Sequence, residues 1–201
     1  MRFGVLVLAA GGSTRMRGRF KLLEDLGGRP VVRWAVEAAM GSGCRPVMVV
    51  LGARAEEVRR VLPETVEVVV NEAWREGMSS SIRAGVGSLP PGTGGVVICL
   101  GDMPFVTPGT IDRLASAAAE HGIAYCRSGE EVRSPSAFRS ELFGDLLRLR
   151  GDAGAKDVIR RNPSRAVGVD VDPVELLDVD TEEELEAARR IAQERGLGWK
   201  R

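Results

Sequence analysis

The chain has 201 residues, a length that suits one domain of moderate size with a sizeable core. Its 28 Lys and Arg residues balance 28 Asp and Glu residues, and this zero net charge argues against a general nucleic-acid binder, which needs a basic field. No apolar run approaches the ~20 residues of a membrane-spanning helix, and no signal peptide is apparent. We therefore expect neither nucleic acid nor membrane among the partners.

The cysteines indicate a compartment. Cys44, Cys99 and Cys126 make an odd number, and no two of them have the CxxC spacing of a metal or redox site. We expect reduced thiols in a cytoplasmic protein.

The first 122 residues alternate between two kinds of segment. Apolar, β-branched runs predict strands, and a 3.6-residue apolar period predicts helices. The predicted strands are 3–10, 45–52, 65–71 and 95–102, and the predicted helices are 29–40, 54–62, 78–89 and 107–122. This order is typical of an α/β protein, a Rossmann-like three-layer α/β/α fold with a mostly parallel sheet.

The rhythm changes after Gly122. Residues 123–138 predict two strands around a turn, one of them antiparallel to the rest of the sheet, and two amphipathic segments follow at 140–150 and 152–162. A strand at 175–180 and a closing helix at 181–196 end the chain, and Thr181 with Glu184 fits a capping box at the start of that helix. With no repeat and no linker, we expect a single domain over residues 1–201.

Ligands of open α/β sheets bind beyond the carboxyl ends of the strands. The loop after the first predicted strand reads AAGGSTRMRGRFK, residues 9–21. Its glycines allow backbone N–H groups to approach a phosphate chain, and Arg15, Arg17, Arg19 and Lys21 can neutralise its charge. The spacing matches neither a Walker A motif nor GxGxxG. The alternative is an ordinary connection with solvated arginines.

A serine cluster and an aspartate follow two other predicted strands. Ser79, Ser80 and Ser81 begin a predicted helix, where hydroxyls and free N–H groups can bind a nucleobase edge or an anion, or simply cap the helix. Asp102 follows the fully apolar central strand directly and can hold Mg²⁺, an ion that prefers oxygen ligands; the alternative is a turn or capping residue.

A last pair of carboxylates precedes the closing helix. We expect only one of Asp178 and Asp180 to face the cleft, and Asp180, the last residue before the helix, is the better candidate. A capping role for Asp180 beside Thr181 is an equally good interpretation. The single histidine, His121, stands at a predicted helix end and is interpreted as a surface residue that compensates the helix dipole. Neither a Ser-His-Asp site nor zinc is indicated.

Taken together, these segments resemble the MobA-like NTP transferase family. LAAGGSTRMRGRFKLL with GGRPVVRWAVEAA is similar to the family's amino-terminal signature, and LGDMPFVTPGTIDRL and DVDTEEEL match in kind and order. EGMSSSIRAG and GDAGAK are most similar to its molybdenum cofactor cytidylyltransferase (MocA-like) branch. Ser134 departs from that branch, which tends to carry His there.

The resemblance implies roles for individual residues. It implies a nucleotide site that wraps the triphosphate, holds its charge with Arg15 and Lys21 and reads the base, preferably a pyrimidine, with Ser79 and Ser80. This implied nucleotide site consists of Ala9, Ala10, Gly11, Gly12, Arg15, Lys21, Asn71, Ser79, Ser80 and Asp102. Arg15, Lys21 and Asp102 are the implied catalytic residues, Asp102 and Asp180 the Mg²⁺ ligands. Asp152 and Lys156 would border the acceptor.

The implied reaction is transfer of a nucleoside monophosphate from an NTP, CTP more readily than GTP, to a phosphorylated acceptor such as molybdopterin, with release of pyrophosphate. Guanylyl transfer to molybdopterin or to another phosphorylated small molecule is the main alternative. An alternative of another class is a non-catalytic, nucleotide-binding partner of a molybdenum hydroxylase.

Overall fold

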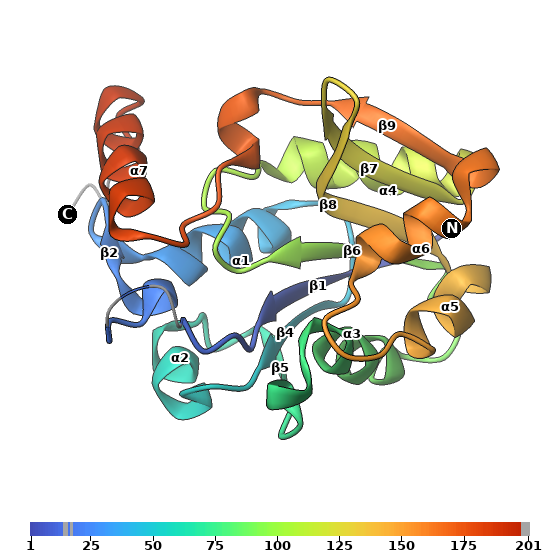
Figure 1. Cartoon of the computed structure of the whole chain (residues 1–201), viewed down its shortest axis with the longest axis horizontal. Helices are drawn as coiled ribbons and strands as arrows, with labels where there is room; N and C mark the ends of the chain where they lie inside the picture. The colour runs from blue at the N-terminus through green and yellow to red at the C-terminus, as the bar shows by residue number, and fades with distance from the viewer. Residues whose placement is uncertain (14–15, 17, 198–201) are drawn as a thin grey trace.

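The computed structural model describes residues 1–13, 16 and 18–197 (Figure 1). Within this part of the chain, seven strands form one sheet in the order β5-β4-β1-β6-β8-β7-β9. The strands are β1 Phe3–Ala9, β4 Val47–Leu51, β5 Glu67–Val70, β6 Gly95–Leu100, β7 Ile123–Ser128, β8 Glu131–Arg139 and β9 Ala166–Asp170; a small separate hairpin pairs β2 Asp25–Leu26 with β3 Arg29–Pro30. Only β8 runs antiparallel to its neighbours β6 and β7. The predicted mostly parallel sheet with one antiparallel strand is confirmed.

Helices cover both faces of this sheet (Figure 1). The helices are α1 Val31–Gly41, α2 Ala55–Val61, α3 Met78–Gly87, α4 Pro108–His121, α5 Phe143–Leu147, α6 Ala155–Arg161 and α7 Glu182–Glu194. Buried side chains of α1, α2 and α4 pack on one face, and those of α3, α5 and α6 pack on the other. The result is the expected three-layer α/β/α arrangement.

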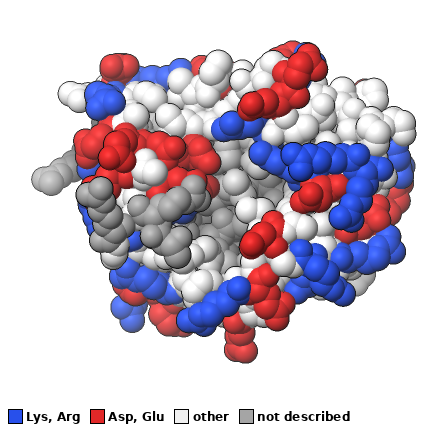
Figure 2. All heavy atoms as spheres, viewed as in Figure 1, with Lys and Arg blue, Asp and Glu red and all other residues white. Residues whose placement is uncertain are grey.

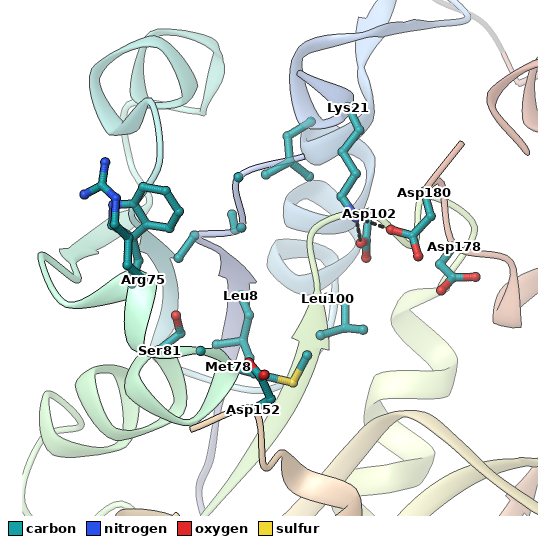
Figure 3. A pocket seen from close by; sticks show the side chains of 17 residues that line it. Leu8, Lys21, Arg75, Met78, Ser81, Leu100, Asp102, Asp152, Asp178 and Asp180 are labelled. Atoms are coloured by element: carbon teal, nitrogen blue, oxygen red, sulfur yellow. Dashed lines mark hydrogen bonds and ion pairs between the residues drawn. The ribbon is translucent and has the colours of Figure 1, made fainter. Parts of the chain in front are cut away.

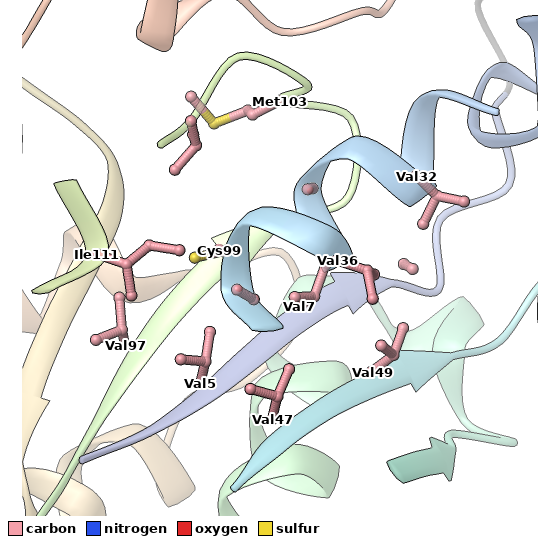
Figure 4. Packing of buried hydrophobic residues seen from close by; sticks show 14 of the residues in the cluster. Val5, Val7, Val32, Val36, Val47, Val49, Val97, Cys99, Met103 and Ile111 are labelled. Atoms are coloured by element: carbon pink, nitrogen blue, oxygen red, sulfur yellow. The ribbon is translucent and has the colours of Figure 1, made fainter. Parts of the chain in front are cut away.

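The alternation of side chains along β1 explains why both faces are apolar. Val5 and Val7 point toward the α1 and α4 layer (Figure 4), whereas Leu6 and Leu8 point toward α3. All four residues are at most 9% exposed. A strand that is buried on both faces needs this continuous apolar sequence, which is typical of central parallel strands.

The chain order creates a crevice between β1 and β6. From β1 the chain moves to β4 and β5 on one side and then returns to β6 on the other side of β1. Leu8 is in register with Leu100, and the Gly101 N–H donates to the Leu8 carbonyl at 2.9 Å. The loop after β1 and the loop after β6 therefore start side by side, at the point where α/β sheets bind ligands.

The prediction of a strand at residues 175–180 is wrong. Pro173 begins a short 3₁₀ turn, Pro173–Leu176, and Asp172 caps it by accepting from the Val174 N–H at 3.0 Å. Proline fixes φ and has no N–H to donate, so it favours this turn at the expense of a ladder. The last strand is instead β9, which pairs in parallel with β7. Its residues are only partly buried, so its pattern is weak in the sequence.

The predicted capping box is confirmed at the start of α7. The Thr181 hydroxyl accepts from the Glu184 N–H at 3.2 Å, and the Glu184 carboxylate accepts from the Thr181 N–H at 2.9 Å. This box fixes the direction in which the chain leaves residues 178–180.

The cysteines are free and buried. Burial raises the pKa of Cys99 and that of Cys126, the latter to about 12, so both thiols stay protonated and unreactive. Across the described residues, no helix combines the length and the apolar character that crossing a membrane requires.

Candidate active site

A cavity of about 450 Å³ opens at the carboxyl ends of β1 and β6. The loop after β1, the segment from Trp74 to Ser81 and the carboxylates of Asp102, Asp178 and Asp180 all line it (Figure 3). Segments that are far apart in the chain therefore supply one site. Its position is the one that the fold predicts for a ligand.

The glycine loop leaves its backbone open to the cavity. Ala9, Ala10, Gly11 and Gly12 all line it. A Cβ atom on Gly11 would meet nothing within 4 Å, so the space in front of this backbone is open. A phosphate chain can approach such a loop closely. Arg15, which the sequence assigns to the triphosphate, lies outside the described residues.

Lys21 joins two of the predicted site carboxylates. Its ammonium group forms an ion pair with Asp102 and donates to Asp180 Oδ1 at 2.6 Å (Figure 3). The three side chains are 12–17% exposed, so the charges interact with little screening by water. The structure thus brings Lys21, Asp102 and Asp180 together from three distant parts of the sequence.

The electrostatics of this cluster are set by burial and by the carboxylates. Burial opposes the charged form of Lys21, but Asp102 and Asp180 together outweigh it and raise the pKa of the ammonium group. Burial raises the pKa of Asp102 despite Lys21, and the nearby negative charges of Asp180 and Asp178 add to the rise. The surroundings of Asp102 therefore favour a further positive charge beside it.

Asp178 also lines the cavity, which corrects the expectation that only one of the last two aspartates faces the cleft. Residues two apart in an extended chain point to the same side, and Val179 between them is fully buried on the other side. The Val179 N–H donates to the Asp102 carbonyl at 2.9 Å and anchors the segment beside the loop after β6.

The carboxylates fit a divalent cation. The Oδ1 atom of Asp102 is buried and has no hydrogen-bond partner, whereas Oδ2 faces Lys21. A buried carboxylate oxygen without a partner is costly, and a metal ion would satisfy it. Among the described residues, no group of three or more His, Cys, Asp or Glu side chains forms a ready-made metal site. Asp102 and Asp180 would thus share the ion with substrate oxygens, as Mg²⁺ sites commonly do.

Only one of the three serines at the start of α3 lines the cavity. Ser79 and Ser80 are buried, and neither lines the cavity. The Ser79 hydroxyl accepts from Arg83 at 3.0 Å, and the Ser80 hydroxyl donates to the Gly77 carbonyl at 2.8 Å. Ser81 is the serine whose side chain lines the cavity (Figure 3).

Asn71 lies behind this wall and orients two of the serines. Its amide nitrogen donates to Ser80 Oγ at 2.8 Å and to Ser81 Oγ at 3.0 Å. A hydroxyl that accepts a hydrogen bond keeps its own proton for another acceptor. The Ser81 hydroxyl is therefore available to donate to a ligand.

Trp74 and Arg75 line the cavity, and sequence reasoning missed both. The Trp74 side chain packs against Gly52 and Gly12. An added Cβ on Gly52 would lie 2.6 Å from the Trp74 side chain, and one on Gly12 would lie 3.2 Å from its indole ring. The Arg75 guanidinium carbon lies 4.3 Å from the indole centroid, a cation–π distance. A single tryptophan in a loop does not indicate a ligand site. The sequence feature that could have indicated the position of Trp74 is Gly52 at the end of a predicted strand, because a glycine there leaves room for a large side chain.

Asp152 and Lys156, the expected acceptor residues, lie at a second hollow. Asp152 lines both the main cavity and a neighbouring hollow of about 290 Å³, and Lys156 lines the neighbouring hollow. The loop that carries Asp152 is held against α3, because the Ser79 N–H donates to the Gly151 carbonyl at 3.2 Å and Arg83 donates to the Leu149 carbonyl at 2.8 Å.

A glycine loop, a lysine and two aspartates at the switch point of a mostly parallel sheet define an α/β protein whose cavity suits an anionic ligand and a divalent cation. The MobA-like NTP transferase domain family matches residues 5–167, most of the chain. The chain belongs to this family of nucleotidyltransferases.

Individual relatives agree with this membership. The structure of Rv0371c from Mycobacterium tuberculosis is 30% identical to this chain with a TM-score of 0.83, and the match covers 94% of this chain and 97% of that one. A further structure of Rv0371c, a complex with manganese, is 28% identical with a TM-score of 0.79 and covers 94% of this chain and 99% of that one. A nucleotidyl transferase from Methanothermobacter is 26% identical with a TM-score of 0.84 and covers 96% and 99%. The bifunctional protein GlmU of Thermotoga petrophila is 41% identical over 77% of this chain, which spans about a third (34%) of that protein's length.

Proposed function

We propose that this protein transfers CMP from CTP to the phosphate of a small acceptor, molybdopterin, and releases pyrophosphate. The observation that carries the proposal is the Lys21–Asp102–Asp180 cluster at the end of a glycine loop, with Asp102 Oδ1 unpaired. The cytidylyl and molybdopterin specificity rests on the resemblance of the EGMSSSIRAG and GDAGAK segments. Three free cysteines are consistent with a cytoplasmic location.

In this proposal the chemistry is an exchange between two phosphates. An oxygen of the acceptor phosphate attacks the α-phosphorus of CTP, and a new oxygen–phosphorus bond forms. The bond from the α-phosphorus to the oxygen that bridges it to the β-phosphorus breaks, and its electrons leave with pyrophosphate. An ionised acceptor phosphate needs no general base, so the reaction does not require a histidine.

The residues of the proposed site have distinct parts in this step. The backbone of Gly11 and Gly12 binds the triphosphate, and Arg15 and Lys21 neutralise it. Asp102 and Asp180 would hold the divalent cation, which we propose is Mg²⁺ and which would supply positive charge to the phosphate oxygens. Ser81, oriented by Asn71, donates to the base, with Ser79 and Ser80 supporting the wall behind it. The rate acceleration comes from aligning the two phosphates and from positive groups that reduce the repulsion between these two anions.

A substrate matrix tests the proposal. The four NTPs are combined with phosphorylated acceptors, molybdopterin included, in Mg²⁺ or Mn²⁺, and pyrophosphate is measured. Pyrophosphate release that requires both CTP and molybdopterin supports the proposal. Preference for GTP would instead indicate a guanylyltransferase. Nucleotide binding without pyrophosphate release for any acceptor would indicate a non-catalytic partner of a molybdenum hydroxylase.

A further inference from the structure

Two hollows adjoin the active-site cavity on the side of β8 and α6. The first, of about 290 Å³, shares Leu8, Met78, Leu100 and Asp152 with the cavity. The second, of about 240 Å³, shares Leu100 and Asp178 with the cavity. Leu100, Ser134 and Lys156 line both hollows, so the two form one continuous recess beside the reacting centre.

The first hollow has an aliphatic floor. Leu8, Ile82, Ile98 and Leu100 come from β1, α3 and β6, and Met78 stands at its edge with 45% of its surface exposed. Large apolar side chains that stay exposed beside a concave surface often mark a ligand site. A ligand body with an apolar face can cover Met78 and Leu100.

The second hollow carries two cations, Arg133 and Lys156. The antiparallel direction of β8 brings Arg133 here, because Ser136 pairs with Ile98 and the start of β8 therefore extends past the carboxyl end of β6. The Arg133 guanidinium donates to the Leu176 carbonyl at 3.1 Å, which fixes the side chain at the rim. The ion-pair partner of Arg133 is Glu131, whose carboxylate is 3.7 Å away and 75% exposed, so it compensates little of the positive charge of Arg133.

Lys156 approaches the same hollow from α6. Its ammonium group makes no hydrogen bond or ion pair with any of the residues that the structure describes. Lys and Arg side chains gather beside the central hollow on the α6 side of the molecule, opposite an acidic group near the start of α7 (Figure 2). The lining of the recess thus combines an apolar floor with three cations, Arg133, Lys156 and Arg160, and three carboxylates, Asp152, Asp157 and Asp178. Arg160 lies 3.8 Å from Asp157, whereas Arg133 and Lys156 lie together in the second hollow and can bind an anion.

We propose that the acceptor is a phosphate monoester with an apolar-faced body, that its reacting phosphate binds between Arg133 and Lys156, and that Arg133 is a specificity-determining residue of this chain. This proposal rests on the proposed function, which requires a phosphorylated acceptor. The body lies over Met78 and Leu100, and the phosphate faces the cavity next to Asp178. Arginine suits the task because its planar fork matches two phosphate oxygens at once.

Phenyl phosphate, a monoester with a flat apolar body, is the probe. It is titrated into the isotopically labelled full chain without nucleotide, and amide shifts are followed by NMR. The amides of Ser134 and Gly154 report the recess, and those of Gly11 and Gly12 report the triphosphate loop, so binding at the two places is distinguished. Inorganic phosphate is titrated in parallel and should bind the recess more weakly.

Arg133→Met and Lys156→Met should each weaken binding at the recess about tenfold, the loss that one charge-assisted hydrogen bond typically causes. Arg133→Lys keeps the positive charge and a donor for the Leu176 carbonyl, so it should weaken phenyl phosphate binding less than Arg133→Met does. Arg161→Met is the matched control, because Arg161 is exposed on the same helix and lines neither hollow. Unshifted Ser134 and Gly154 amides, or equal affinities for Arg133→Met and Arg161→Met, would overturn the proposal. Because this binding experiment contains no NTP, its result can be interpreted even if the protein proves to have no nucleotidyl transfer activity.

Discussion

Lys21 concentrates the chemistry of the site in one side chain. Its ammonium group is bound to Asp102 and Asp180, the two carboxylates that fit a divalent cation. The same side chain lines the cavity together with the glycine loop, where we propose that it neutralises a triphosphate. In the proposed function, Lys21 and a metal ion would therefore compete for the carboxylates until a nucleotide gives the lysine another anion.

Replacement of Lys21 by Met should separate these two roles. Without the ammonium group, Asp102 loses its ion-pair partner and Asp180 loses one of its partners, so Mn²⁺ should bind the nucleotide-free protein several-fold more tightly. NTP affinity and turnover should both fall. Electron paramagnetic resonance of free Mn²⁺ and pyrophosphate release measure the two effects. Unchanged NTP affinity together with unchanged turnover would remove Lys21 from the site.

The single histidine offers a prediction of the opposite kind. His121 lies at the end of α4, its side chain is 54% exposed, and the nearest carboxylate oxygen of Glu120 is 3.9 Å from its Nε2. The His121→Ala variant should retain wild-type turnover, because a surface histidine at a helix end contributes no catalytic group. Steady-state pyrophosphate release measures this. An inactive variant would mean that the chemistry has been assigned to the wrong residues.

Sequence patterns predicted that Asp102 and Asp180 lie at the cleft, and the family resemblance singled out Lys21; the structure brings these three side chains together. The sequence patterns did not identify Ser81 over Ser79 and Ser80. That choice depends on the rotation of α3 about its axis, which the Asn71 and Arg83 hydrogen bonds fix in three dimensions. Trp74 was missed for the same reason, since its place depends on contact with Gly52.

At the scale of elements, the start of α3 connects the two halves of the site. Gly77 has φ +103°, and an added Cβ would lie 2.5 Å from both the Gly151 carbonyl oxygen and the Asp152 carboxylate. Only glycine tolerates this backbone and this close approach. The close packing places the Asp152 loop, and with it the start of α6, against the nucleotide cavity.

Gly77→Ala should therefore destabilise the protein by about 1–3 kcal/mol, the usual range for an incompatible positive φ with a steric clash. Thermal unfolding measures the change. Gly87→Ala is the control, because Gly87 ends the same helix and has open space around its Cβ position; it should be neutral or slightly stabilising. Equal stabilities of the two variants would contradict the proposed packing of this loop.

Elements were predictable where local signals agree. The strands before residue 103, the helices and the α7 capping box follow from apolar period and capping residues. β9 was not predictable, because it is short and half-buried and Gly168 leaves room for the Arg127 side chain. The segment at 175–180 imitates a strand by its apolar residues, but the turn begun by Pro173 and the Val179–Asp102 hydrogen bond direct it to the cavity instead.

At the scale of the whole molecule, the site depends on topology. The switch between β1 and β6 opens the crevice, and the last segment before α7 returns across the sheet to add Asp178 and Asp180. The sequence order of motifs predicted that these parts meet. It could not predict the recess beside β8, because the approach of Arg133 and Lys156 depends on the direction and register of an antiparallel strand.

The most direct test of the account is pyrophosphate release by Asp102→Asn with saturating CTP, acceptor and Mg²⁺. Asparagine keeps the shape of the side chain but removes the charge that would hold the cation, so turnover should fall at least ~100-fold, the scale for loss of one key charge-stabilising group. Asp145→Asn, on α5 and outside the cavity lining, should match the wild type. Near-normal Mg²⁺-dependent turnover in Asp102→Asn would contradict the account at its centre.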